Sequence, residues 1–451
     1  MTPSLLRETL SICPSCARTL DARIVERSGA VYMEKTCPDH GSCITYLWPD
    51  AQHYRWLEGF RAPLVSPLAA TGAGRACPAG CGLCASHLRR ATLVELEVTR
   101  RCDLRCPVCF VAAGEPLAEP DLETLQSMFT AALAQAGAET SIQLTGGEPT
   151  VRDDLQRIVR SARALGFHAV EINTNGLRIA SEPGYLESLR SSGISGVYLQ
   201  FDGLNDAAYE ALRGHALLQE KLAAVARCRQ AGVQVVLAMT VVRGVNEDQL
   251  GSVLAFALEN RDVVAGVAYQ PAFTSGRFEP EAAVSIGLGD VVLGLAEQSY
   301  GLIGPRDLWP LTTSHPLCSV GTLLLRSKNT FESATRFITM EDFVEGCDAA
   351  SPQGSVFSDL LARKGVDVSD GLSVVVMNYM DATNLDLERL RECSMVVTME
   401  DGRLVPFCAY QLTTASGDRQ HVAWGRNEQP PSSTVPELAS ELAGLAPVAQ
   451  D

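Results

Sequence analysis

Three cysteines in the segment TRRCDLRCPVCF have a spacing suited to binding a metal cluster. Cys102, Cys106 and Cys109 are separated by three and two residues. One loop with this spacing can place three thiolates around a [4Fe-4S] cubane, and three ligands for four irons leave one iron open to an external ligand. A structural zinc loop is the alternative, but zinc needs a fourth protein ligand and no paired group follows at the usual distance. The segment therefore predicts a reactive iron–sulfur cluster.

The N-terminal segment holds a second ligand pattern, made of two pairs. Cys13 and Cys16 form one pair, and Cys37 and His40 form the other after a gap of twenty residues. Two pairs on facing turns of a small ribbon can enclose one tetrahedral ion. Iron in a rubredoxin-like site and zinc both fit these ligands, and Cys43 is an alternative to His40. We expect one mononuclear Fe or Zn ion here.

Six more cysteines form two further groups. One group lies in the run CPAGCGLCASH, where His87 or a distant cysteine can complete the ligand set. The other is divided among HPLCSV, RECSMVV and VPFCAYQ, and Cys347 is a candidate fourth ligand for it. The alternative is that these C-terminal cysteines are buried thiols that bind no cluster. We expect one or two auxiliary [4Fe-4S] clusters in these groups. The candidate ligands are Cys77, Cys81, Cys84, Cys318, Cys393 and Cys408.

Strands and helices that could position these sites alternate from residue 93 onward. Helical patterns near 121–137, 153–165, 204–213, 217–231 and 247–260 separate the strands. Six such strands predict an α/β fold with a parallel sheet, most simply a partial (β/α)6 barrel, and a doubly wound open sheet is the alternative. In both folds active sites lie at the carboxyl ends of the strands. The predicted strands are 93–99, 141–145, 168–174, 196–202, 233–242 and 263–270.

Changes in composition divide the chain into five predicted segments. The first has short β-like runs and little core, which favours a small ribbon stapled by a metal. A stretch rich in Gly, Pro and Ala follows and is typical of a linker. The predicted boundaries are 1–60 for the rubredoxin-like ribbon, 61–92 for the linker with auxiliary-cluster cysteines, 93–300 for the barrel, 301–412 for a mixed α+β C-terminal extension with iron–sulfur ligands, and 413–451 for a mobile tail.

The composition of the 451-residue chain excludes several classes of protein. A formal net charge of −16 argues against nucleic-acid binding, which needs basic surface to displace counterions. No apolar run reaches the length of about 18 residues that a transmembrane segment needs, and the N-terminus lacks the pattern of a secretory signal. Fifteen cysteines in such a chain indicate metal ligands or thiols rather than disulfides, so we expect a cytoplasmic protein.

Glycine-rich and polar motifs follow the predicted strands in the order QLTGGEPT, INTNG, YLQFDG, VVRGVNED and AYQPAF. Behind the three-cysteine loop, this series resembles the radical S-adenosylmethionine (radical SAM) superfamily. The resemblance implies that the glycine-rich motif presents backbone groups to the methionine amino group of the cofactor, and that the later motifs contact its ribose, carboxylate and adenine. The cofactor-binding residues implied are Gly146, Gly147, Glu148, Pro149, Asn173, Asn175, Gln200, Asp202, Thr240 and Gln270.

The resemblance also implies a radical reaction carried by the cluster at Cys102, Cys106 and Cys109. The open iron chelates S-adenosylmethionine, and an electron from the reduced cluster releases a 5′-deoxyadenosyl radical that removes a hydrogen atom from the substrate. An electron donor such as ferredoxin or flavodoxin has to supply that electron.

Further motifs, among them CPSC, CPDHG, CPAGCGLC, HPLC and MDATNLDLERLREC, narrow the resemblance to one subgroup. It contains archaeal tetraether lipid synthases and pterin dimethyltransferases. We therefore expect a methyltransferase or alkyl-transferring enzyme that forms a C–C bond on a small or medium organic substrate. A lipid-acting C–C coupling enzyme is the alternative, although no basic amphipathic helix for membrane docking is visible. A non-catalytic iron–sulfur electron carrier would leave the strand-end motifs unexplained.

Overall fold

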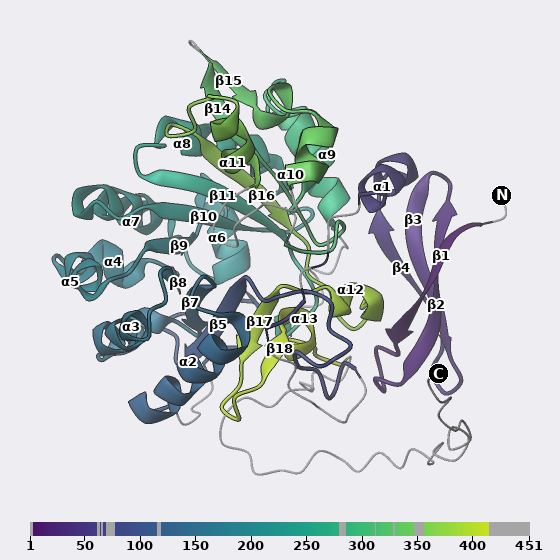
Figure 1. Cartoon of the computed structure of the whole chain (residues 1–451), viewed down its shortest axis with the longest axis horizontal. Coiled ribbons are helices and arrows are strands. Elements are labelled where there is room, and N and C mark those ends of the chain that lie inside the picture. The colour runs from purple at the N-terminus through teal and green to yellow at the C-terminus, as the bar shows by residue number, and fades with distance from the viewer. Residues whose placement is uncertain are drawn as a thin grey trace, which may run out of the picture.

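The computed structural model describes residues 3–60, 64, 66–68, 77–114, 119–278, 286–311, 313–327, 330–346 and 356–414. Cys347 and the predicted tail from residue 415 onward lie outside the described residues. A small β-sheet near the N-terminus lies beside a much larger sheet that is covered by helices (Figure 1). The large sheet holds the residues that the sequence assigns to the radical chemistry.

The N-terminal sheet is an antiparallel meander of four strands that pair in chain order. Three of the strands contain the β-like runs expected from the sequence, whereas the first is an addition. The inner face of this sheet is fully buried at Ile24 and Val31. Asp50 caps the following helix, α1 (Ala51–Glu58), by accepting hydrogen bonds from two backbone amides of that helix. The strands are β1 (Ser4–Ile12), β2 (Thr19–Arg27), β3 (Ala30–Cys37) and β4 (Gly41–Trp48).

Six parallel strands form the centre of the large sheet, and helices cover its outer face (Figure 1). The strands neighbour one another in chain order, without the reversal that defines a doubly wound sheet, so the partial barrel is confirmed and the alternative is wrong. The strands are β5 (Leu93–Thr99), β7 (Ser141–Gly146), β8 (Val170–Thr174), β9 (Gly196–Gln200), β10 (Val235–Val241) and β11 (Val264–Pro271).

All five predicted crossover helices are present, and the connection between β8 and β9 holds two further helices that the sequence pattern does not predict. No helix among the residues that the structure describes is long and apolar enough to cross a membrane. The helices of this region are α2 (Leu122–Ala136), α3 (Leu155–Ala164), α4 (Leu177–Ser181), α5 (Tyr185–Ser192), α6 (Asp206–Arg213), α7 (Leu218–Ala231), α8 (Leu250–Glu259) and α9 (Leu288–Gln298).

Strands from the C-terminal region extend the same sheet at both ends. One of them, β16, pairs in parallel with β11, and another, β17, pairs in parallel with β5. The region assigned to an extension thus adds strands to the sheet of the barrel. Its elements are β13 (Trp309–Pro310), β14 (Ser319–Ser327), β15 (Thr330–Ser333), β16 (Leu372–Met377), β17 (Met395–Thr398), β18 (Leu404–Pro406), α10 (Met340–Gly346), α11 (Val356–Arg363), α12 (Leu387–Arg391) and α13 (Phe407–Tyr410).

Alternation along β5 shows how the sheet separates the core from the barrel interior. Val94, Leu96 and Val98 are fully buried in the main hydrophobic core. Because successive side chains of a strand point to opposite faces, Glu95 and Glu97 point to the other side, into the barrel. The side of β5 that faces the barrel interior therefore carries carboxyl groups, whereas the outer side of the same strand is entirely apolar.

The N-terminal ribbon docks against the C-terminal region at α12 (Figure 1). Arg7 and Thr9 of β1 both bind the carboxylate of Asp386, and Thr9 Oγ1 lies 2.8 Å from Asp386 Oδ1. Asp386 also caps α12, where it accepts hydrogen bonds from the backbone amides of Glu388 and Arg389. One buried carboxylate thus joins the first strand of the chain to a late helix.

Candidate active site and metal centres

A cavity enters the barrel from the carboxyl ends of the parallel strands. The three cysteines of the cluster loop line it, together with residues from the ends of β7 to β11. Two of the predicted cofactor-binding residues do not line it: Pro149 begins a short 3-10 helix behind the glycine-rich motif, and Asp202 is fully buried. The predicted residues that do line the cavity are Gly146, Gly147, Glu148, Asn173, Asn175, Gln200, Thr240 and Gln270.

The cluster loop leaves β5 and ends in β6 (Val108–Cys109), which pairs with β12 (Arg277–Phe278). Arg277 Nε donates a hydrogen bond to the carbonyl oxygen of Cys106 at 2.8 Å, which fixes the middle of the loop. Burial raises the pKa of the Cys102 thiol to about 12, so this thiol stays neutral until a metal takes the place of its proton. Three thiols in one loop beside an open cavity fit a [4Fe-4S] cluster with a free coordination position.

The glycine-rich motif brings the end of β7 against the backbone of the cluster loop. The backbone amide of Gly147 donates to the carbonyl oxygen of Thr99 at 2.7 Å, and that of Glu148 donates to Arg101 at 2.8 Å. A Cβ atom on Gly147 would overlap the carbonyl oxygen of Arg101, so the close approach requires glycine. These two amide protons are used inside the protein, so the motif offers a ligand its carbonyl oxygens, which are acceptors. A ligand amino group is the donor that suits them.

The carboxylate of Glu148 joins this motif to the loop after β8. It accepts hydrogen bonds from the hydroxyls of Thr150 and Thr174 at 2.6 and 2.7 Å, and from the backbone amide of Asn175 at 2.6 Å. Asn175 Nδ2 in turn donates to Asp103 of the cluster loop at 2.6 Å. Burial raises the pKa of Glu148, whereas these donors favour its charged form. The side chains of Glu148 and Asn175 therefore position the cluster loop.

A buried ion pair supports the other side of the cluster loop. Arg213 Nε and Nη2 donate to the two oxygens of Asp202 at 2.7 and 2.9 Å, and Nη1 donates to the carbonyl oxygen of Val108 at 3.1 Å. Burial raises the pKa of the Cys106 thiol, and the nearby charge of Arg213 opposes that shift. Asp202 thus acts on the site by holding Arg213, although it does not line the cavity.

Aromatic side chains form one wall of the cavity. Gln270 Nε2 donates to the hydroxyl oxygens of Tyr198 and Tyr379 at 3.0 and 3.3 Å. The ring centroid of Tyr379 lies 4.6 Å from that of Phe407 and 5.2 Å from that of Phe273. A wall of packed rings next to fixed polar groups suits a planar ligand.

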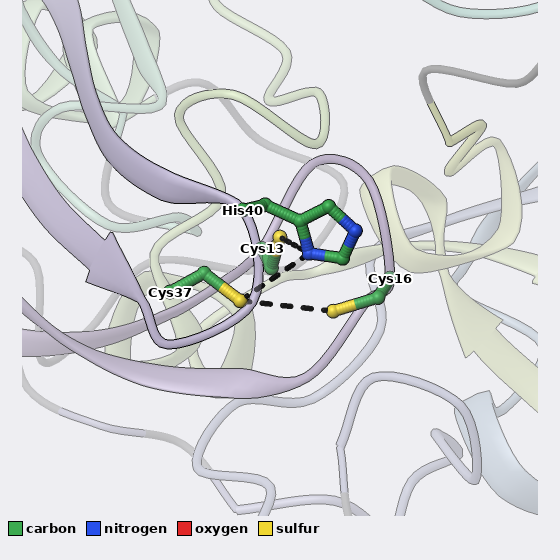
Figure 2. A group of neighbouring side chains, drawn as sticks. All are labelled: Cys13, Cys16, Cys37 and His40. Carbon is green, nitrogen blue, oxygen red and sulfur yellow. Dashed lines mark hydrogen bonds between the residues drawn. The ribbon is translucent and has the colours of Figure 1, made fainter.

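The side chains of Cys13, Cys16, Cys37 and His40 point toward one another from two turns of the ribbon, and their ligand atoms all lie within 4.8 Å of one another (Figure 2). His40 Nδ1 lies 3.4 Å from Cys37 Sγ and 3.6 Å from Cys13 Sγ. The hydrogen bond to His40 lowers the pKa of Cys37 to about 6. Three sulfur atoms and one imidazole nitrogen fit a single tetrahedral ion, and the alternative ligand Cys43 stands outside the group.

The remaining predicted ligands approach one another near β17. A charge on Cys318 raises the pKa of Cys393, and a charge on Cys393 raises the pKa of Cys408 and of Cys81 in the preceding group. His87 Nε2 lies 2.8 Å from the carbonyl oxygen of Cys393 and is engaged with the backbone there. Within the described ranges, no second group of ligand atoms is gathered as tightly as in the ribbon. A cubane spreads its ligands over several irons, so its thiols lie farther apart than those around one ion.

Three residues that shape the site escape prediction from the sequence. Lys221 is fully buried and its Nζ donates to the carbonyl oxygen of Asn175 and to Gln200 Oε1 at 2.5 and 2.6 Å. Arg213 and Lys221 lie on helices, where charged residues usually face solvent. Glu95 stands in an alternating strand, a pattern typical of one solvent-facing side. The available signal is the parallel sheet itself, because its strands are covered on both faces.

Comparison with known proteins separates the chain into two matched regions. Residues 96–257 match the Radical SAM superfamily, and residues 5–49 match the HMPTM N-terminal zinc ribbon domain. Among solved structures, Streptococcus suis SuiB bound to S-adenosylmethionine is 17 % identical, with 47 % of each chain covered and a TM-score of 0.39.

Two relatives extend the comparison. The GTP 3′,8-cyclase of Peptoclostridium acidaminophilum is 29 % identical over 42 % of this chain and 58 % of its own. The 7,8-dihydro-6-hydroxymethylpterin dimethyltransferase of Methanocaldococcus jannaschii is 30 % identical over 90 % of this chain and 93 % of its own. These matches confirm the predicted enzyme class and its need for a [4Fe-4S] cluster and S-adenosylmethionine, and the ribbon match supports a mononuclear metal. The chain therefore belongs to the radical SAM superfamily, in the family of the 7,8-dihydro-6-hydroxymethylpterin dimethyltransferases.

Proposed function

We propose that this enzyme transfers a methyl or other alkyl group to a carbon atom of a small, pterin-like substrate and so forms a C–C bond. The observation that carries the proposal is a cavity whose lining combines the three cluster-loop cysteines with aromatic rings and a few fixed polar side chains. Packed rings beside amide and carboxyl groups suit a planar heterocycle rich in nitrogen. The dimethyltransferase from Methanocaldococcus jannaschii, which acts on a dihydropterin, supports the same substrate class.

The protein's own residues hold and shield the reacting groups. The bound cluster and S-adenosylmethionine supply a 5′-deoxyadenosyl radical that removes a hydrogen atom from the substrate. Cys102, Cys106 and Cys109 hold the cluster, while the polar residues at the ends of β7 to β11 bind the cofactor. The cavity walls place the target carbon and exclude water.

The other metal ligands belong to the same proposal. The ribbon, residues 1–60, holds one Fe or Zn ion. The cysteines of the linker, 61–92, and of the C-terminal extension, 301–412, bind one or two auxiliary [4Fe-4S] clusters beside the barrel, 93–300. Cys81 and Cys408 belong to one buried cluster of side chains, which supports a location where both segments meet.

An electron donor and a reducing compartment complete the proposal. Reduction of the cluster requires an electron donor such as ferredoxin or flavodoxin. The described residues include fourteen free cysteines, which remain reduced in a reducing compartment, and the cytoplasm is the compartment that fits.

A lipid-acting C–C coupling enzyme is the alternative function, and a test has to distinguish it from the proposed function. An alkyl chain has no use for hydrogen-bonding groups, whereas Glu95, Gln143 and Gln270 stand among the mostly apolar residues that line this cavity. Anaerobically reconstituted protein is incubated with dithionite, S-adenosylmethionine and one of two deuterated substrate sets. One set is a pterin with a methylene-folate, and the other is a lipid extract.

We expect deuterium to appear in 5′-deoxyadenosine only with the pterin set, as measured by mass spectrometry. Deuterium transfer from the lipid extract alone would show that the substrate class is wrong. A protein that carries its cluster but releases no 5′-deoxyadenosine with either set would contradict the proposed reaction.

The cluster loop is tested by Cys106→Ala. This variant is expected to lose 5′-deoxyadenosine release, because two thiolates cannot hold the cubane in its open form, and to keep the ribbon ion. Iron, zinc and sulfide are counted per chain. Cys228→Ala is the matched control, since Cys228 is fully buried in α7 and does not line the cavity. Continued cofactor cleavage by Cys106→Ala would show that the loop assignment is wrong.

A further inference from the structure

Glu95 is a buried carboxyl group in the cavity that lacks a partner. It lines the cavity but is only 4 % exposed. Its Oε2 atom has no hydrogen-bond partner among the described residues. A buried carboxyl group without a partner costs free energy of folding, so natural proteins rarely retain one without a use. The group is therefore available to a ligand.

The neighbouring strands do not supply the missing partner. On β7, Gln143 stands next to Glu95 in register, but its Nε2 donates to Glu171 at 2.8 Å, its Oε1 accepts from Asn173 at 3.2 Å, and it forms no hydrogen bond with Glu95. On β17, the neighbour in register is Val397, which is apolar and fully buried. Hydrogen-bond donors for Glu95 therefore have to come from the cavity.

Two hydroxyl groups near Glu95 add donors to the same pocket. Tyr198 and Tyr379 both accept a hydrogen bond from Gln270, so each hydroxyl proton remains free for an acceptor. Both tyrosines line the same cavity as Glu95, and a charge on Glu95 raises the pKa of both hydroxyl groups. The pocket thus presents one carboxyl acceptor beside two hydroxyl donors, next to the aromatic wall.

We propose that Glu95 anchors the substrate by accepting two parallel hydrogen bonds from adjacent N–H groups on the edge of a planar heterocycle. The amino and ring N–H groups of a 2-amino-4-oxopyrimidine have this arrangement, and a carboxylate pairs with such an edge through both oxygens. The carbonyl oxygen next to that edge is the acceptor for the tyrosine hydroxyls. This inference rests on the proposed function, because it concerns the substrate of the same cavity.

The charge state of Glu95 gives the inference a measurable consequence. Burial, with a smaller contribution from the carboxylate of Glu97, raises the pKa of Glu95 to about 8. Glu95 is therefore protonated at pH 7 in the empty cavity, whereas two N–H donors favour the ionised carboxylate. Substrate binding near pH 7 releases a proton, and the release disappears well above pH 8, where Glu95 is already ionised.

Calorimetry on the anaerobic holoenzyme tests this role without turnover, with S-adenosylmethionine present and no reductant. The probes are 6-hydroxymethyl-7,8-dihydropterin, the lumazine analogue with oxygen in place of the 2-amino group, and the fragment 2-amino-4-oxopyrimidine. Buffers of different ionisation enthalpy count the protons released. The variants are Glu95→Gln and, as a matched control, Glu171→Gln, which removes a half-buried carboxylate but keeps an oxygen that can accept from Gln143.

We expect Glu95→Gln to weaken binding of the dihydropterin about 10- to 100-fold, the loss typical of hydrogen bonds to a charged group. It should also remove the proton release and the preference for the pterin over the lumazine. Glu171→Gln should retain the affinity of the unmodified enzyme. Unchanged affinity and preference in Glu95→Gln overturn the inference, as do equal losses in both variants.

The fragment separates this inference from the proposed function. If the unmodified enzyme binds the fragment through Glu95 but does not bind the dihydropterin, the proposed substrate is wrong and the anchoring role stands. If the unmodified enzyme and Glu95→Gln bind the dihydropterin with equal affinity, the proposed substrate is supported and the anchoring role is wrong. Binding of none of the three probes overturns both.

Discussion

Glu95 and Glu148 are both almost completely buried, and their surroundings give them different tasks. Glu148 accepts hydrogen bonds from three neighbouring residues and so fixes two loops. Glu95 has no such partners and lines the cavity. A carboxyl group whose hydrogen bonds are satisfied within the protein acts on the structure, while an unsatisfied one keeps its capacity for a ligand.

Replacing Glu95 by Gln should make stability less dependent on pH. The pKa of Glu95 is about 8 in the folded protein, against about 4.3 in an unfolded chain. Between these values the native state binds more protons than the unfolded state, so the free energy of unfolding falls as pH rises. Neutral Gln lacks this dependence. We expect Glu95→Gln to be more stable than the unmodified protein above pH 8, with a gap that shrinks toward pH 5.

Anaerobic thermal unfolding without substrate measures this difference at each pH. A gap of the same size at pH 5 and pH 8.5 would show that Glu95 does not titrate in this range.

Single residues differ in how readily a sequence reveals their roles. Cys102, Cys106 and Cys109 are recognisable because three thiols at this spacing have few other uses. Glu95 is not, because the segment LVELEVT alternates as a half-exposed strand does. Its burial depends on the strands that close around it, and no local pattern records them.

At the scale of elements, the end of β7 and the start of the cluster loop form one unit. The motif needs glycine because the two backbones touch there. Gly147→Ala is expected to destabilise the protein by about 1–3 kcal/mol, the usual cost of overpacking, and to lower cluster content. Iron and sulfide per chain after reconstitution, with chemical unfolding, measure both effects.

Gly59→Ala is the matched control for this change. It adds the same methyl group after α1, where a φ of −68° is open to any residue and the nearest carbonyl oxygens lie 3.3 Å from the added Cβ, against 2.1 Å at Gly147. Full cluster content in Gly147→Ala would show that the loop tolerates the displacement.

The six barrel strands are predictable because each carries its own apolar pattern between turn signals. The positions of β16 and β17 are not, since Leu93 pairs with Met395 from the far end of the chain. Such pairings depend on tertiary structure. The sequence pattern therefore indicates the strands of 301–412 less clearly than the six barrel strands. The helices α4 and α5 are short, and their pattern is correspondingly weak.

At the scale of the whole molecule, charged side chains link the ribbon to Cys318, one of the predicted auxiliary ligands. Burial alone would raise the pKa of Asp386, but the charges of Arg7 and Arg389 bring it below its usual value. Arg389 Nη2 also lies 3.3 Å from Cys318 Sγ. The contact of Arg7 and Arg389 with Asp386 joins residue types that occur throughout the chain and positions that are far apart in sequence. Motif spacing therefore indicates the two predicted metal-binding regions but not how they dock.

Arg7→Ala is expected to cost about 3 kcal/mol of stability, because it leaves the Asp386 charge buried without its main partner. The pKa of Asp386 is lowered in the folded protein, so its contribution is present above the unfolded value of about 3.9 and is lost as pH falls through the folded value. The loss in Arg7→Ala should therefore shrink in acid. Urea unfolding at several pH values measures it.

Arg23→Ala is the control for the ribbon variant, because Arg23 is an exposed residue of β2 and forms no ion pair among the described residues. Equal stability of Arg7→Ala and Arg23→Ala would show that the Asp386 contact does not hold the ribbon.

The contact between Arg7 and Asp386 spans 379 positions of the chain. Translation delivers N-terminal residues first, so the ribbon emerges and can take up its ion long before Asp386 leaves the ribosome. The surroundings of Cys318 are completed only when nearly the whole polypeptide has been synthesised. Under the proposed ligation, assembly therefore has a built-in order, in which the ribbon acquires its mononuclear ion early and the cluster proposed at Cys318 is completed last.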